Sequence, residues 1–238
     1  MSEVVVVTGS SSGIGRAVAE RFASDGARVI VNSARSVEEG EMLARSLPEA
    51  VYVRADVSRE EDARRLVATA LERFGRVDVV VNNAGTTRRI PFADLESADD
   101  ELWRRILGVN LIGPWYLSRA AVPALREAKG AIVNVGSVAG IIAAGSSLPY
   151  AVSKAALHHL TRTLAQALAP DVRVNAVAPG LVDTPWTAGW EANDAIIART
   201  PLGRAATPQD VADVVVALAR TPFATGQVVV VDGGLTLT

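Results

Sequence analysis

The sequence predicts an α/β protein with a doubly wound parallel sheet that is covered by helices on both faces. Short runs rich in β-branched residues alternate with longer stretches of helical periodicity along the whole chain. Regular alternation of this kind implies right-handed βαβ crossovers, which join parallel strands. Several short runs, such as Val4–Val7, are apolar at every position. This pattern is typical of strands that are buried on both faces.

Seven strands and six helices are expected in alternation along the chain. The strands are predicted at Glu3–Thr8, Arg28–Asn32, Val51–Arg54, Val77–Val81, Ala131–Val135, Arg173–Val177 and Gln227–Val231. The helices are predicted at Gly13–Ser24, Val37–Leu47, Arg59–Phe74, Asp99–Ala128, Tyr150–Ala169 and Pro208–Ala219. No repeat or linker interrupts the pattern, so we expect one domain over residues 1–238. Residues 180–207 are rich in Pro, Gly and Trp and lack a strong pattern, and we expect them to form a lid.

Composition excludes several classes of function. The net charge of -2, with both signs interspersed, argues against nucleic acid or an anionic membrane as the main partner. The absence of cysteine excludes disulfides, thiolate catalysis and Cys-ligated metals. The two histidines, His158 and His159, diverge on a helix, so no metal site is expected. The amino terminus does not resemble a signal peptide, and no apolar run approaches the ~18 residues of a membrane span. We therefore expect a cytoplasmic protein.

Tyr150 and Lys154 are the first candidates for catalysis. They are four residues apart at the start of a helical pattern, so their side chains share a helix face. A free tyrosine has a pKa of about 10, and a nearby cation lowers that pKa towards the range that proton transfer needs. Ser137 follows an apolar strand and can point to the same place. Surface Tyr/Lys pairs on helices are common, but together with Ser137 this pair predicts proton transfer to a carbonyl or from an alcohol.

A glycine-rich turn, Thr8–Gly15, lies between the first strand and the first helix. Its glycines allow a close approach to a pyrophosphate, and the helix N-terminus offers unpaired N–H groups. The turn therefore predicts dinucleotide binding, although its spacing is G-x-x-x-G-x-G. The same residues also match G-x-S-x-G, with Ser11 in the place of a hydrolase nucleophile. A serine hydrolase needs a histidine base, and both histidines lie in the middle of a predicted helix, which disfavours this alternative.

Further motifs appear in order along the chain. They are Asp56-Val57, Asn82-Asn83-Ala84-Gly85, Asn110, Pro179-Gly180 and Val231-Asp232-Gly233-Gly234. Together with the glycine turn and with Ser137, Tyr150 and Lys154, these motifs form a specific pattern that covers the whole chain. By this pattern the sequence resembles the short-chain dehydrogenase/reductase family. The resemblance implies a Rossmann-like fold with seven parallel strands, and hydride transfer between a nicotinamide and a carbonyl or alcohol.

The resemblance also implies the role of each catalytic residue. Tyr150 is the general acid in reduction and the general base in oxidation, and Lys154 lowers its pKa and binds the nicotinamide ribose. Ser137 holds the substrate oxygen, and Asn110 supports a water in a proton relay. Asn110 also has a local argument, because Pro114 lacks the N–H that would bond its carbonyl in a regular helix. The alternative is that Gly113-Pro114 only bends this helix.

The residues expected around the dinucleotide come from six segments. They are Gly9, Ser11, Ser12, Gly13, Ile14, Gly15, Arg35, Ser36, Asp56, Val57, Asn83, Ala84, Gly85, Tyr150, Lys154, Pro179, Gly180, Val182 and Thr184. Asp56 is expected at the adenine amino group, or alternatively as a cap of the following helix.

The choice between the two nicotinamide cofactors depends on Arg35. In dinucleotide-binding folds an acidic residue ~20 positions after the glycine motif binds the ribose of NAD, whereas an Arg there accommodates the 2′-phosphate of NADP. Arg35 stands at this distance from Gly15, and the segment Asn32–Ser36 has no carboxylate. The sequence therefore favours NADP(H) over NAD(H), unless Arg35 is merely solvated or Glu38 and Glu39 offset its charge.

The substrate is expected to have an apolar body. Val138, Leu148 and Trp186 are the expected contacts, and Arg88 and Arg89 either meet an acidic group or are solvated. A 3-oxoacyl thioester is one candidate substrate of such a reductase. The alternative functions are an NAD(H)-dependent alcohol or sugar dehydrogenase and a non-catalytic dinucleotide sensor. The helices predicted at Asp99–Ala128 and Tyr150–Ala169 are apolar over more than one face, so each needs a second surface to pack against besides the sheet. The resemblance implies a homodimer or homotetramer.

Overall fold

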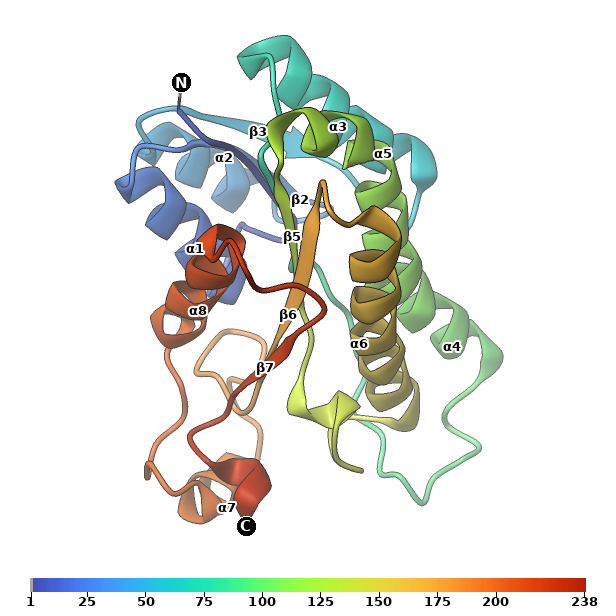
Figure 1. The fold of residues 1–238 in the computed structure, drawn as a ribbon. Helices are drawn as coiled ribbons and strands as arrows, with labels where there is room; N and C mark the ends of the chain where they lie inside the picture. The colour runs from blue at the N-terminus through green and yellow to red at the C-terminus, as the bar shows by residue number, and fades with distance from the viewer. Residues whose placement is uncertain (1) are drawn as a thin grey trace.

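The computed structural model describes residues 2–238 and confirms the doubly wound parallel sheet (Figure 1). The strands are β1 (Val4–Val7), β2 (Arg28–Ser33), β3 (Ala50–Arg54), β4 (Val79–Asn82), β5 (Ala131–Val135), β6 (Arg173–Pro179) and β7 (Val228–Val231). They are ordered β3-β2-β1-β4-β5-β6-β7, and every neighbouring pair is parallel. Strands β1 to β3 are added towards one edge of the sheet and β4 to β7 towards the other, so the strand order reverses between β1 and β4. In open α/β sheets, ligands bind beside such a reversal at the carboxyl ends of the strands.

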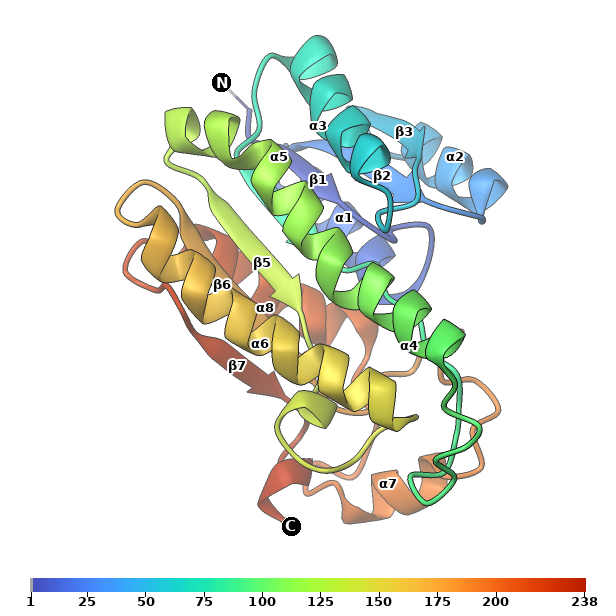
Figure 2. The same cartoon turned by 90° about the vertical axis from the view of Figure 1, so that its right-hand side faces the viewer.

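Helices cover both faces of the sheet, as Figure 2 shows. One face carries α1 (Gly13–Ser24), α2 (Val37–Ser46) and α8 (Pro208–Arg220), and the other carries α3 (Glu60–Phe74), α5 (Gly113–Ala128) and α6 (Leu148–Leu168). Alternate residues of β1 enter different cores: Val5 and Val7 pack with α1 and α8, whereas Val4 and Val6 pack with α3, α5 and α6. This double burial explains why the strands are apolar without alternation. Among the helices of residues 2–238, none is long and apolar enough to cross a membrane.

The long helix predicted at Asp99–Ala128 is interrupted. It consists of α4 (Asp100–Leu107), a π-helical turn at Gly108–Ile112 and α5. Pro114 has no N–H, so the regular α-helical hydrogen bonding fails near this point, and a π-turn absorbs the defect. Gly113 lies against the chain after β3, because a Cβ there would come within 3.0 Å of the Val57 carbonyl oxygen.

Three short elements were not predicted. They are α7 (Asn193–Arg199) and the 3₁₀ turns Val138–Gly140 and Leu235–Leu237. α7 falls within the stretch that showed no pattern, and none of its residues is buried, so it has no apolar stripe to detect. Other boundaries shift by one or two residues. For example, α6 begins at Leu148 rather than Tyr150, with Pro149 in its first turn, where its missing N–H is harmless.

Candidate active site

A cavity of about 810 Å³ opens at the carboxyl ends of the strands, between the glycine turn and residues 180–207. Most of the predicted site residues line it. They are Gly9, Ser11, Ser12, Gly13, Ile14, Arg35, Ser36, Asp56, Val57, Asn83, Ala84, Gly85, Ser137, Val138, Tyr150, Lys154, Pro179, Gly180, Val182, Thr184 and Trp186. Three predicted residues, Gly15, Asn110 and Leu148, are not among its lining residues. Segments far apart in the sequence therefore meet at one place.

Tyr150 and Lys154 lie on one face of α6, and Ser137 approaches from the end of β5. The Lys154 ammonium is 5.7 Å from the centre of the Tyr150 ring. Its Nζ donates a 2.8 Å hydrogen bond to the carbonyl of Val135, the last residue of β5. Lys154 is buried, with only 4% of its surface exposed. This lysine therefore ties the helix of the tyrosine to the strand that precedes the serine.

The pKa values of this site differ from the expected pattern. Burial raises the pKa of Tyr150, and a hydrogen bond with Ser137 acts in the opposite direction. Burial also lowers the pKa of Lys154 to about 8. Lys154 is not among the causes of the Tyr150 pKa shift, so its expected effect on that pKa stays a prediction. In this structure the loss of hydration penalises both charged forms, and the Lys154 ammonium bonds to a backbone carbonyl.

Asn110 lies behind the cavity, in the π-helical turn, and it is fully buried. Its Oδ1 accepts from the Thr86 N–H at 2.8 Å, and its Nδ2 donates to the Thr86 carbonyl at 3.0 Å. The same Nδ2 donates to Ser153 Oγ at 3.0 Å, and Ser153 Oγ donates to the Tyr150 carbonyl at 2.7 Å. The Asn110 side chain thus joins the loop after β4 to the first turns of α6, on which Tyr150 sits.

The glycine turn forms an open cradle. Gly9 and Gly13 have positive φ angles of 61° and 54°, and a Cβ on Gly9 would lie 2.8 Å from the Cα of Ala84. Within residues 2–238 the Ser12 side chain makes no capping hydrogen bond, so the first N–H groups of α1 remain available to a ligand. These features fit the pyrophosphate of a dinucleotide. Gly15 instead allows close packing, since its Cβ would lie 2.4 Å from the Gly9 oxygen.

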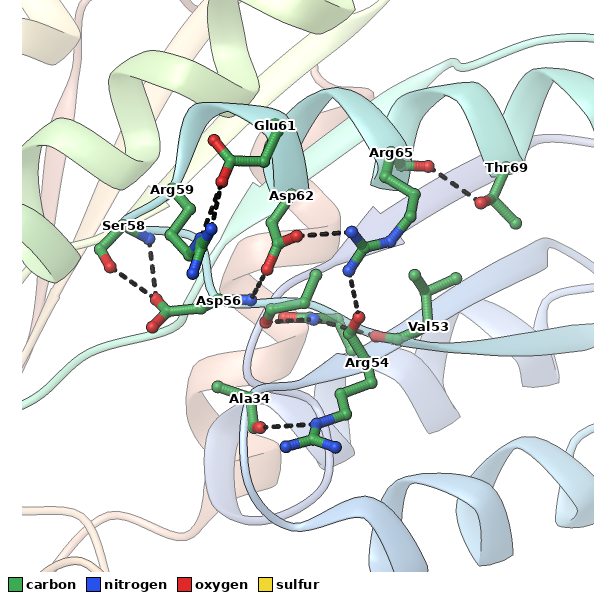
Figure 3. A network of polar contacts seen from close by, with 12 residues as sticks. Ala34, Val53, Arg54, Asp56, Ser58, Arg59, Glu61, Asp62, Arg65 and Thr69 are labelled. Atoms are coloured by element: carbon green, nitrogen blue, oxygen red, sulfur yellow. Dashed lines mark hydrogen bonds and ion pairs between the residues drawn. The ribbon is translucent and has the colours of Figure 1, made fainter.

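Asp56, which also lines the cavity, is held in a network of polar contacts (Figure 3). Its Oδ1 accepts from the N–H and the hydroxyl of Ser58, at 3.0 and 2.7 Å. Its own N–H donates to Asp62 Oδ2 at 2.7 Å. The N-cap residue of α3 is Arg59, so the capping alternative for Asp56 is wrong, and Asp56 instead stabilises the turn before this helix. Arg35 and Ser36 are exposed on the cavity rim.

Tryptophans form the wall near Tyr150. The rings of Trp186 and Tyr150 have centres 6.4 Å apart and are tilted by 47°. Trp190 stacks under the guanidinium of Arg89, 5.4 Å from the ring centre. Arg88 donates to the Ser97 carbonyl, so it is not merely solvated.

Sequence reasoning did not place Arg105 or Leu235 at the cavity, and it expected residues 180–207 there only as a segment, without singling out Ile196 or Arg199. Ile196 and Arg199 belong to α7, which left no periodic signal in the sequence. His158 was assigned no chemistry, but its Nε2 accepts from the Ser137 N–H at 3.5 Å. The serine hydrolase alternative needs this imidazole beside Ser11, and it lies beside Ser137 instead.

Known proteins of similar sequence show to which class of protein this chain belongs. A family model described as enoyl-(acyl carrier protein) reductase matches residues 9–236. The protein named "Granaticin polyketide synthase putative ketoacyl reductase 2" of Streptomyces violaceoruber is 57% identical over 236 residues, which cover 97% of this chain and 95% of that one. The 3-oxoacyl-(acyl-carrier-protein) reductase of Thermotoga maritima is 38% identical, covering 99% and 98%.

A solved structure agrees with this class. The short-chain dehydrogenase/reductase described as glucose/ribitol dehydrogenase from Brucella melitensis has a TM-score of 0.92 and 36% identity, covering 98% of this chain and 96% of that one. The fold and these relatives define an oxidoreductase that uses a nicotinamide dinucleotide. The chain belongs to the short-chain dehydrogenase/reductase family.

Proposed function

We propose that this protein is an NADP(H)-dependent reductase of a carbonyl compound, with Tyr150 as the proton donor. One observation carries the proposal: Tyr150, Ser137 and Lys154 line the same cavity as the glycine cradle. A bound nicotinamide supplies the hydride in reduction and accepts it in oxidation. This chain's residues must then hold the carbonyl, supply a proton to its oxygen and exclude water.

In this proposal Ser137 holds the substrate oxygen and Tyr150 gives it a proton. Burial raises the pKa of Tyr150, so the phenol keeps its proton at neutral pH and is ready to act as an acid. Lys154 would bind the nicotinamide ribose and would keep its hydrogen bond to the Val135 carbonyl. Asn110 supports Tyr150 through Ser153, as the hydrogen bonds between them suggest. The expected water at the Asn110 carbonyl stays a prediction.

The preference for NADP(H) is supported by the chemistry of the rim. Arg35 and Ser36 are exposed there, and Asn32–Ser36 offers no carboxylate to the ribose. An arginine pairs with the 2′-phosphate of NADP and gains nothing from the hydroxyl of NAD. Fluorescence titrations with NADPH and NADH test this preference, and tighter NADH binding would reverse it.

An apolar carbonyl compound is the proposed substrate, with a 3-oxoacyl thioester as the first candidate. Val138 and Trp186 line the cavity near Tyr150, and Leu148, which was also expected there, does not. Two relatives are named as ketoacyl or 3-oxoacyl reductases, which favours the same class. A panel of carbonyl compounds, followed by NADPH absorbance, tests it. A sensor on this fold would bind NADPH and consume none with any of them.

We also propose a cytoplasmic homodimer or homotetramer in which residues 180–207 form the lid of one catalytic domain. Ile112, Trp115 and Val152 are exposed apolar side chains around α5 and α6, where a second copy can cover them. Arg89 and Trp190 connect this lid to the loop after β4. Sedimentation velocity measures the oligomeric state, and a monomer at micromolar concentration would contradict this part of the proposal.

A further inference from the structure

His158 is a buried histidine that the proposed proton transfer does not use. It lies on α6, four residues after Lys154 and therefore on the same face of the helix, and only 3% of its surface is exposed. The other histidine, His159, is exposed. A buried imidazole needs hydrogen-bond partners, so its surroundings show what it does.

Two glycines make room for this ring. A Cβ on Gly136 would lie 2.1 Å from His158 Nε2, and a Cβ on Gly140 would lie 2.8 Å from its Cε1. Any side chain at either position would therefore overlap the imidazole. Gly136 and Gly140 bracket the turn that begins with Ser137. The turn is thus wrapped around the His158 ring.

The ring also bonds to the turn. His158 Nε2 accepts the backbone N–H of Ser137 at 3.5 Å. An imidazole nitrogen accepts only when it carries no proton, so the ring is neutral, with its proton on Nδ1. Burial above all, together with the cations of Lys154 and Arg162, lowers the pKa of His158 to about 4, against a hydrogen bond with the Gly140 backbone that raises it. The neutral form therefore persists at pH 7.

The opposite side of the turn is anchored to the sheet. The Gly136 N–H donates to the Val177 carbonyl at 2.7 Å, which connects the turn to β6. Within the turn, Ser137 Oγ accepts from the Ala139 N–H at 3.1 Å. His158 adds a connection to α6, the helix that carries Tyr150. The turn that carries Ser137 is therefore held between β6 and α6.

We propose that His158 is a positioning residue, which holds the turn Gly136–Gly140 against α6 and so sets the placement of Ser137 beside Tyr150. The inference rests on the proposed reductase function. A displacement of a reacting group by about 1 Å can slow a reaction ~100-fold. The loss of one ordinary hydrogen bond corresponds to about tenfold.

A kinetic double-mutant cycle tests the role. H158L removes the acceptor at similar volume, whereas H158Q keeps an amide oxygen within reach of Ser137. With NADPH and a 3-oxoacyl N-acetylcysteamine thioester, H158L should lower kcat about tenfold. H158Q should recover most of this loss. In an S137A background H158L should have no further effect on kcat, because the serine that it positions is gone.

A purely structural role predicts another outcome. H158L would then lower kcat by the same factor with and without Ser137, and this result would overturn the proposal, as would an unchanged kcat in H158L. NADPH fluorescence and circular dichroism establish first that each variant is folded. If H158L is not folded, H158N takes its place, since the shorter amide does not reach Ser137.

A measurement without turnover separates this inference from the proposed function. Nitrogen-15 NMR of the labelled wild-type protein at pH 7 should show His158 with an unprotonated Nε2 and a protonated Nδ1. A proton on Nε2 would overturn the inference, since the Ser137 N–H would then face another donor. A wild-type protein with this tautomer that reduces no carbonyl would count against the proposed function alone.

Discussion

At the scale of single residues, the candidate active site contains ionisable side chains, Tyr150 and Lys154, that are buried and removed from solvent. Tyr150 and Lys154 were identifiable from their spacing, because i and i+4 positions share a helix face. Their pKa shifts were not predictable, since they come from burial in the folded structure, where Lys154 bonds to Val135 and Trp186 lies beside Tyr150. The same burial opposes both charges, and it favours a neutral phenol that acts as an acid.

His158 should make the protein less stable in mild acid. Its folded-state pKa of about 4 lies below the ordinary value of 6.5, so the unfolded chain binds the proton first as the pH falls. Stability is full above about pH 7 and is lost as the pH drops from ~6.5 towards 4. Between pH 7 and pH 5 the loss should be about 2 kcal/mol. Urea unfolding at both pH values measures it.

The matched controls are H158Q and H159Q. H158Q should flatten this part of the pH dependence, whereas H159Q, at an exposed neighbouring position, should retain it. Equal slopes in wild type and H158Q would show that other groups cause the acid sensitivity.

Arg35 should govern the cofactor preference. Arg35→Ala removes a charged partner of the 2′-phosphate, and a hydrogen bond between charged groups is worth ~1.5–3 kcal/mol. The Kd of NADPH should rise roughly 10- to 150-fold, while the Kd of NADH should stay within about twofold. Fluorescence titration gives both constants. Equal losses for the two dinucleotides would show that Arg35 does not contact the 2′-phosphate.

At the scale of elements, periodicity predicted the seven strands and most helices, because each buries an apolar stripe or run. It did not predict the π-helical turn at Gly108–Ile112, because the local pattern there is still helical and the defect comes from Pro114. It also missed α7, which buries none of its residues. Leu148 was expected at the substrate, but α6 starts two residues before Tyr150, and Leu148 is not a lining residue of the cavity.

Gly15 should be essential to the contact between the glycine turn and α1. In Gly15→Ala the new Cβ would lie 2.4 Å from both the Gly9 oxygen and Asn83 Nδ2. Relieving this overlap should cost about 1–3 kcal/mol of unfolding free energy. Gly108→Ala is the control, because its Cβ would meet only Ser58 Cβ, at 3.7 Å. Urea unfolding that ranks G108A as the less stable variant would contradict the packing argument.

Arg89 should hold residues 180–207 near the loop after β4. An exposed cation–π pair contributes about 0.5–1 kcal/mol, so Arg89→Ala should raise KM by roughly two- to fivefold with kcat little changed. Arg45→Ala on α2, paired only with Glu41 among residues 2–238, is the control. Steady-state kinetics measure both variants. A lower kcat at constant KM would place Arg89 in the chemical step instead.

At the scale of the whole molecule, the sheet order brings the glycine turn after β1 and the serine turn after β5 to one edge. The fold could be predicted because its motifs follow each strand in a fixed order. Cofactor preference and assembly could not be settled in the same way. They depend on one exposed side chain at the rim and on surfaces that face outward, where the sequence is not constrained by burial.

The central claim is that the Tyr150 hydroxyl gives its proton to a substrate oxygen in this cavity. NADPH oxidation by Tyr150→Phe, with a carbonyl compound that the wild-type protein reduces, tests the claim most directly. General acid catalysis contributes typically 10²- to 10⁴-fold, so the rate should fall by roughly this factor. NADPH should still bind, with a Kd raised by no more than about tenfold, since at most one hydrogen bond to the dinucleotide is lost. A phenylalanine variant that reduces the same compound at the wild-type rate would contradict the account.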